Sequence, residues 1–137
     1  MPPESINQCE ALLFTLATST STLHGIAGLV EPGSNERLRL DAKTSTVSDA
    51  GEVIAARVEK ATEDHGLESA LHELHDGFMV ELSETRKAIR REAARKNPSA
   101  VVVARLKAQK DGLQLVISLL RVHVNLVKFK LRETAQS

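Results

Sequence analysis

The stretch Leu113–Leu131, LQLVISLLRVHVNLVKFKL, decides the fold. At about 100° per residue, its apolar side chains fall on two nearly opposite faces of one helix. The first face holds Leu113, Val116, Ile117, Leu120, Val124, Val127 and Leu131, and the second holds Leu115, Leu119, Val122, Leu126 and Phe129. A helix at the edge of a bundle needs one apolar face, so the second face needs a contact of its own. That contact is either another helix of this chain, with this helix at the centre of the bundle, or a second copy, a lipid or a missing domain.

The rest of the chain carries apolar repeats and end signals for three more helices. Pro32-Gly33 ends the first helix, His65-Gly66 ends the second, and Asn97-Pro98 caps the last. Between the first two, Arg37–Leu40 alternates like a strand but is too short and isolated to build a sheet. We therefore expect an all-α bundle of about four helices in one domain, residues 1–137, with helices over 5–31, 46–65, 67–97 and 98–132 and a long crossover loop over 32–45.

Composition excludes several classes of protein. The chain has no Trp or Tyr and three Phe, so the core must be aliphatic, and a binder that stacks nucleic-acid bases on aromatic rings is not expected. The longest apolar run, Ala100–Ala104, is far shorter than the roughly 20 residues of a membrane span. The start, Met1-Pro-Pro-Glu, does not resemble a signal peptide, so we expect a cytoplasmic protein. Cys9, the single cysteine, is interpreted as a buried thiol or as a redox or intermolecular site.

Charge is segregated along the chain although its sum is zero. Residues 1–85 carry a net charge of −10, and residues 86–137 carry +10. The densest basic stretch is a candidate contact surface for anionic partners: Arg86, Lys87, Arg90, Arg91, Arg95 and Lys96. The alternative is structural, because acidic and basic helices that pack side by side attract each other.

One cluster has the residue types of a metal site. Glu68, His72, His75 and Asp76 are neighbours on a helix surface, but their spacing is not that of the His-Glu-x-x-His metalloproteases. They lie opposite the apolar stripe of their helix, so we interpret them as a solvated charged face. No nucleophile motif or glycine-rich phosphate loop occurs in the sequence, and we expect no enzymatic activity, no catalytic residue, no metal and no cofactor.

Two segments resemble a known family. Leu12–Pro32, LLFTLATSTSTLHGIAGLVEP, and Leu106–Leu120, LKAQKDGLQLVISLL, are similar to helices of the HeLo-like N-terminal domains of fungal signalling NTPases. The second segment has the form L-x-x-x-K-x-x-L-x-L-x-x-x-L. The resemblance implies a helical bundle that signals by self-association, with relatives that act at membranes in programmed cell death. The chain departs from that family at its start, where a Gly/Ala-rich apolar helix is missing.

These observations predict a non-enzymatic helical interaction module with a signalling or scaffold role. We expect it to self-associate, or to bind a partner protein, through the second face of the last helix: Leu115, Leu119, Val122, Leu126 and Phe129. Two alternatives remain open. The bundle could carry a fatty acid or another apolar ligand in its core, or its basic stretch could bind an anionic membrane surface.

Overall fold

The computed structural model describes the backbone of residues 3–61 and 64–136, with all side chains in that range except those of 3–9, 64–65, 127–128, 130–131 and 134–136. Four helices account for most of these residues, and no strand occurs among them: α1 (Pro3–Gly28), α2 (Asn35–Glu59), α3 (Asp64–Ala93) and α4 (Ala100–Gln136). The predicted all-α bundle of four helices is confirmed. Over their described residues, none of these helices has the length and hydropathy needed to cross a membrane.

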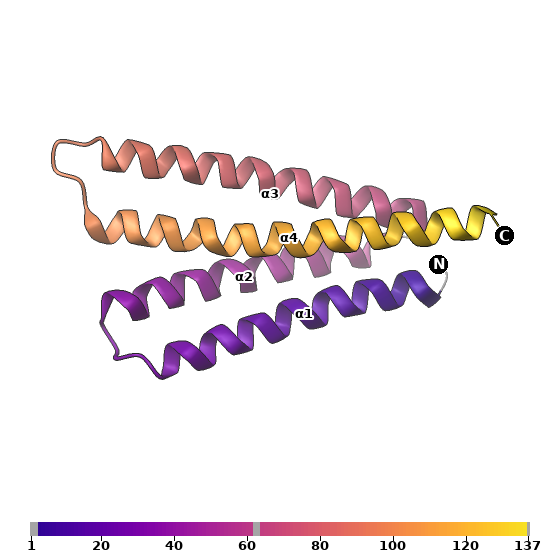
Figure 1. The fold of residues 1–137 in the computed structure, drawn as a ribbon, viewed down its shortest axis with the longest axis horizontal. Helices are drawn as coiled ribbons and strands as arrows, with labels where there is room; N and C mark the ends of the chain where they lie inside the picture. The colour runs from indigo at the N-terminus through magenta and orange to yellow at the C-terminus, as the bar shows by residue number, and fades with distance from the viewer. Residues whose placement is uncertain (1–2, 62–63, 137) are drawn as a thin grey trace.

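The helices run alternately up and down the bundle (Figure 1). The α1–α2 and α3–α4 connections lie at one end, and the start of α1 and the end of α4 lie at the other. α4 packs extensively against α3 and α2 and less against α1, whereas α2 and α3 make little contact. α4 is therefore the central helix of the bundle, and α3 lies at an edge with α4 as its main neighbour.

The core is a column of aliphatic side chains with Phe78 as its one aromatic member among the described residues. Each helix contributes residues spaced three or four apart, because that spacing keeps side chains on one helix face. Burial of one such side chain contributes roughly 1.5–3 kcal/mol to stability. The fully buried members of largest volume are Leu12, Ile54, Leu67, Leu71, Leu120, Val47 and Val116.

The expected crossover loop between the first two helices is wrong. α2 begins at Asn35, so the connection between α1 and α2 is short. Gly33 turns the chain with a φ of +83°, a conformation that glycine adopts without strain. Ser34 then caps α2, since its hydroxyl accepts a hydrogen bond of 3.1 Å from the backbone N–H of Arg37. The segment that alternates like a strand is thus the first turn of a helix.

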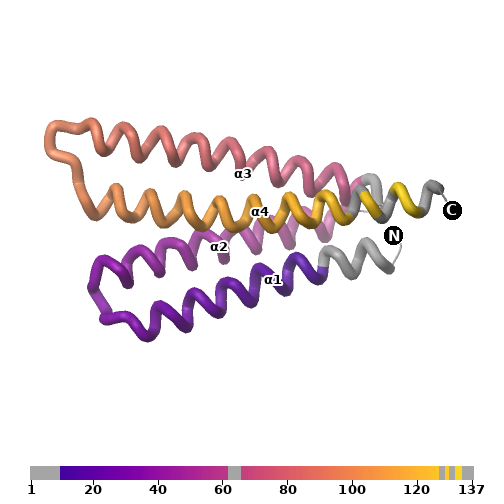
Figure 2. Tube along the Cα trace, viewed as in Figure 1, coloured from indigo at the N-terminus to yellow at the C-terminus, as the bar shows by residue number. Residues whose placement is uncertain are grey.

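Two other predicted helix ends also differ from those in the structure. Gly66 does not end the second helix, because α2 ends at Glu59 and Gly66 lies inside α3. Asn97 does not cap the last helix. α4 begins at Ala100 after a turn over residues 94–99 (Figure 2), and the hydroxyl of Ser99 accepts a hydrogen bond of 3.3 Å from the N–H of Val102.

The carboxylate of Glu92 stabilises the turn between α3 and α4 through hydrogen bonds. It accepts a hydrogen bond of 3.0 Å from the backbone N–H of Ser99, and Arg95 donates to both carboxylate oxygens. The Ser99 N–H, followed by the Arg95 guanidinium, holds the pKa of Glu92 below its usual value. This carboxylate therefore stays ionised and fixes the direction in which α4 leaves α3.

Candidate functional site

The structure divides the predicted second face of α4 into two parts. Leu115 and Leu119 are half-buried and pack against the core. Val122, Leu126 and Phe129 remain exposed, with 55%, 37% and 56% of their surface accessible. We call these three residues the α4 patch. Their spacing of four and three residues places them beside each other on one side of the helix.

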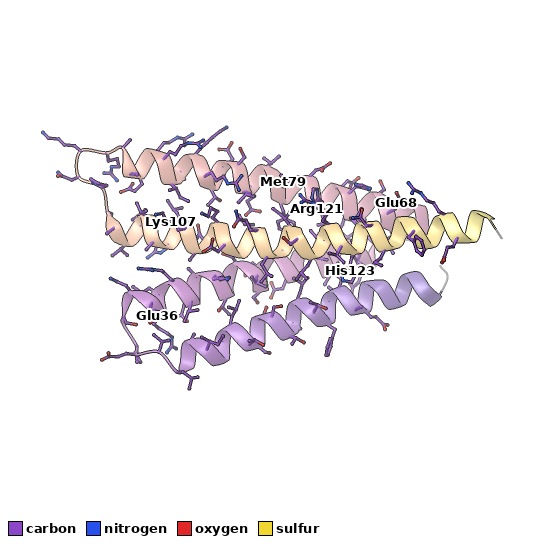
Figure 3. All side chains as sticks on the ribbon, viewed as in Figure 1. Glu36, Glu68, Met79, Lys107, Arg121 and His123 are labelled. Carbon is purple, nitrogen blue, oxygen red and sulfur yellow. The ribbon has the colours of Figure 1, made fainter. Side chains whose placement is uncertain are left out.

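The α4 patch faces away from α3. Arg121 marks the α3 side of α4, because its guanidinium lies 3.5 Å from His75 Nε2 of α3. Figure 3 shows Arg121 between the two helices. At about 100° per residue, the patch residues lie about 80–140° around the helix axis from Arg121. Contacts of α4 with α3 therefore leave the patch open.

All six residues of the predicted basic surface are exposed at the end of α3 and in the following turn: Arg86, Lys87, Arg90, Arg91, Arg95 and Lys96. Lys87 pairs with Glu84 at 3.3 Å and Arg95 pairs with Glu92 at 3.0 Å, both within the same stretch of chain. No ion pair with another described residue engages the remaining four. Among the described residues, none of these six side chains forms an ion pair with a residue of α1, α2 or α4.

The cluster of histidines and carboxylates on α3 forms two separate pairs. His72 Nε2 lies 3.8 Å from Glu68 Oε1, and His75 Nδ1 lies 3.3 Å from Asp76 Oδ1. His75 also faces Arg121, a cation that a metal ion would have to approach. Among the described residues, no group of three or more His, Cys, Asp or Glu side chains is arranged to hold a metal ion.

An open groove of about 800 Å³ lies between the first half of α2 and the first third of α4. Its floor is apolar and made of small side chains, and its rim carries the cations Arg39, Lys43 and Lys107. Glu36 and Asp111 also line it, and Figure 3 shows Glu36 and Lys107 on its two sides. We call it the α2–α4 groove. Its volume is large enough to admit a small ligand.

A close contact between α2 and α4 at Gly112 adjoins the groove, since Lys43 and Asp111 line it. A Cβ atom at this position would lie 3.1 Å from the side chain of Thr46 and 3.2 Å from the carbonyl oxygen of Lys43. A larger residue would require Thr46 or the backbone of Lys43 to shift by a few tenths of an ångström, so glycine suits this close approach of α2 and α4. The spacing of apolar residues did not indicate this contact. From the sequence, Gly112 is only a residue of low helix propensity within a predicted helix.

The burial of the His123 side chain was not predicted from the sequence. The pattern assigns it to a polar strip between the two apolar faces of α4, yet only 8% of its surface is accessible. Its Nδ1 has no hydrogen-bond partner among the described residues, and burial lowers the pKa of the imidazole. Its position between two apolar faces is the signal that should have indicated burial.

The side chain of Cys9 lies outside the described residues, so its predicted burial is not addressed. Comparisons of the chain with protein-family models, with curated proteins and with solved structures found no match. The function therefore has to be inferred from the surfaces described above.

Proposed function

We propose that this chain is a non-enzymatic helical interaction module that self-associates through the α4 patch. The observation that carries the proposal is the exposure of Val122, Leu126 and Phe129 on one side of a helix that packs into the core through other residues, such as Leu120 and Val124. Adjacent exposed apolar side chains often mark an interaction site. The resemblance of two segments to HeLo-like domains, which signal by self-association, supports the same function.

The size of the α4 patch sets the expected strength of the contact. Burial of apolar surface contributes about 25 cal/mol per Å², so three partly exposed side chains contribute a few kcal/mol for each copy. Association costs about 4–15 kcal/mol in lost translational and rotational freedom. We therefore expect a reversible dimer that forms with rising concentration. Because the contact is apolar, added salt should not dissociate the dimer.

The experiment is light scattering over a range of protein concentrations in 50 mM and 500 mM salt. The wild-type mass should rise at least to that of a dimer in both salts, and the double variant Leu126→Asp/Phe129→Asp should remain a monomer in 500 mM salt, where contacts between charged surfaces are screened. Val101→Asp is the matched control, because Val101 is a similarly exposed apolar residue on the same helix, outside the patch. A wild-type monomer at every concentration in 500 mM salt, or a dimer of the double variant that persists in 500 mM salt, would refute this function. Circular dichroism checks that each variant stays helical.

The α2–α4 groove supports a second candidate, the carriage of an amphipathic anion such as a fatty acid. An apolar floor suits an alkyl chain, and the rim cations Arg39, Lys43 and Lys107 suit a carboxylate. Titration with palmitate, followed by calorimetry, tests this candidate. Ala104→Phe places a large side chain on the floor of the groove and should abolish the heat of binding, whereas Leu126→Asp should leave it unchanged.

A further inference from the structure

The outer face of α3, directed away from α4, is a second surface without a neighbour. At about 100° per residue, one side of this helix carries twelve residues, and all but Glu68 and His72, which are half-buried, are exposed. They are Glu68, Ser69, His72, Glu73, Asp76, Met79, Val80, Ser83, Arg86, Lys87, Arg90 and Arg91. We call this set the α3 outer face. α3 packs mainly on α4 and only slightly on α2, so no described helix covers it.

Charge changes sign at the middle of the α3 outer face. Its first half carries three carboxylates, Glu68, Glu73 and Asp76, and its second half carries four cations. Between the halves lie two apolar residues, Met79 with 39% and Val80 with 64% of its surface accessible. Figure 3 shows Glu68 nearer the end where the termini lie and Met79 nearer the middle of the helix. The helix macrodipole favours this order of charges, but it does not require exposed apolar residues at the centre.

This arrangement is complementary to itself when two helices run antiparallel. A two-fold axis through the midpoint between Met79 and Val80 places the acidic half of each copy on the basic half of the other. Glu73 precedes this midpoint by as many residues as Arg86 follows it, and Glu68 and Arg91 are related in the same way. The apolar centre then meets its own copy. Contacts of this kind, in which one patch binds the same patch of a second subunit, form the commonest symmetric dimers.

We propose that the α3 outer face joins two copies of this chain as an antiparallel, electrostatically matched helix pair. The cations are available for this contact, because no ion pair or side-chain hydrogen bond with another described residue engages Arg86, Arg90 or Arg91. Among the acids, Glu73 shares an exposed ion pair of 2.9 Å with Arg57 of α2. Such a pair can be extended to a second arginine, since a carboxylate has two acceptor oxygens.

The contact is small and depends on salt. Residues 68–91 extend about 35 Å at 1.5 Å per residue, and a strip of that length and one helix width, about 10 Å, is smaller than the roughly 800 Å² per partner of a standard interface. Charge pairs at its rim are screened within about 10 Å in 0.1 M salt and within about 3 Å in 1 M salt. This dimer therefore dissociates as salt is raised.

The inference goes beyond the proposed function and does not require the α4 patch. The patch lies on the side of α4 turned away from α3, so one chain can use both surfaces. A molecule with two different self-complementary surfaces can extend into larger assemblies. The two contacts differ in their response to salt, so the failure of one is distinguishable from the failure of the other.

The test uses the Leu126→Asp/Phe129→Asp background, in which the α4 patch no longer binds. Analytical ultracentrifugation of this parent in 50 mM salt should show a dimer that is lost in 500 mM salt. In that background, Glu68→Lys/Glu73→Lys gives a face with net positive charge in both halves, and Arg86→Glu/Arg90→Glu/Arg91→Glu gives one with net negative charge in both. Each variant alone should dimerise at least tenfold more weakly than the parent, because like charges then oppose each other.

A mixture of the two variants provides the decisive measurement. Both halves of the basic variant then face acidic halves of the other, so an equimolar mixture should form a dimer that native mass spectrometry identifies as one copy of each. Rescue by mixing also shows that both variants fold. The proposal is overturned by a parent that is monomeric in 50 mM salt, by variants that dimerise as the parent does, or by a mixture that fails to pair. Binding of the parent, but not of Arg86→Glu/Arg90→Glu/Arg91→Glu, to phosphatidylserine vesicles, together with a mixture that fails to pair, would assign the basic half to anionic membranes instead.

Discussion

The helices α3 and α4 are both long and amphipathic, but they occupy different positions in the bundle. α4 has two apolar faces and packs against all three other helices, whereas α3 has one apolar stripe and packs mainly on α4. Most of the described charged residues of α3 are exposed, with Glu92 near its end as the buried exception, while α4 buries a histidine in its middle. The comparison teaches that the number of apolar faces on a helix indicates how many helices pack against it. The residues that no helix of the same chain covers are the candidates for contacts with other molecules.

The largest expected effect comes from the core side of α4. Leu120 is fully buried at the centre of the bundle, whereas Val80 on α3 is largely exposed. Leu120→Ala should lower the free energy of unfolding by about 2–5 kcal/mol, because it leaves a cavity among helices that cannot fully relax. Val80→Ala, the control on the edge helix, should change it by less than about 0.5 kcal/mol. Urea unfolding followed by circular dichroism measures both, and similar losses would mean that α3 is as enclosed as α4.

A second comparison uses one glycine from each helix. Valine at Gly112 of α4 would press against Thr46 and the backbone of α2, so Gly112→Val should cost about 1–3 kcal/mol of stability. At Gly77 of α3, no atom lies within 4 Å of the added Cβ, so Gly77→Val should be neutral or slightly stabilising. Thermal unfolding of the two variants gives the contrast. Equal tolerance at both positions would show that α2 and α4 do not approach closely at Gly112.

The class of the fold could be predicted because the apolar residues of α4 repeat at helical spacing on two faces. A strand does not show this spacing, and an isolated helix would leave both faces exposed to water. It did not predict the start of α2. In that segment Lys43 and Thr44 interrupt the apolar repeat, and the cap formed by Ser34 precedes residues that alternate like a strand. Helix ends depend on a few local hydrogen bonds, such as the one between Ser34 and Arg37, and spacing alone does not reveal them.

The candidate surface was predicted in part. Spacing groups Leu115 and Leu119 with Val122, Leu126 and Phe129, because all five share one side of α4. The structure separates them, since the first two pack against the core and the last three remain exposed. The difference lies in the positions of neighbouring helices along α4, which the pattern within one helix does not contain. The α3 outer face was visible as charged sequence, but its midpoint and its free position required the arrangement of the bundle.

A smaller effect should follow from the buried histidine of α4. Burial lowers the pKa of His123 from its ordinary value of 6.5, so the unfolded chain binds the proton more readily than the folded one does. The folded state therefore loses stability as the pH falls below about 6.5. His123→Leu removes this penalty and an unpaired buried nitrogen, so it should raise the free energy of unfolding by about 1 kcal/mol at pH 7 and by more at pH 5.5. Urea unfolding at both values of pH tests this, and an equal pH dependence in both proteins would contradict it.

The smallest effect is expected in the turn between α3 and α4. The Ser99 N–H and the Arg95 guanidinium favour the ionised form of Glu92 and lower its pKa in the folded state from the ordinary 4.5. The resulting stabilisation is present above pH 4.5 and is lost as the pH falls through the lower folded value. Glu92→Gln should therefore lower the thermal midpoint slightly at pH 7, and this difference from the wild type should shrink toward pH 3. Glu84→Gln is the matched control, because the one ion pair of its carboxylate with a described residue is with the exposed Lys87, and this change should shift the midpoint less. Hydrogen exchange adds a local readout, since the amide of Ser99 should exchange faster in Glu92→Gln while the amides in the middle of α3 keep their protection. If the Ser99 amide exchanges at the wild-type rate in this variant, the carboxylate does not hold the turn, and the direction of α4 is set by its packing against α2 and α3 alone.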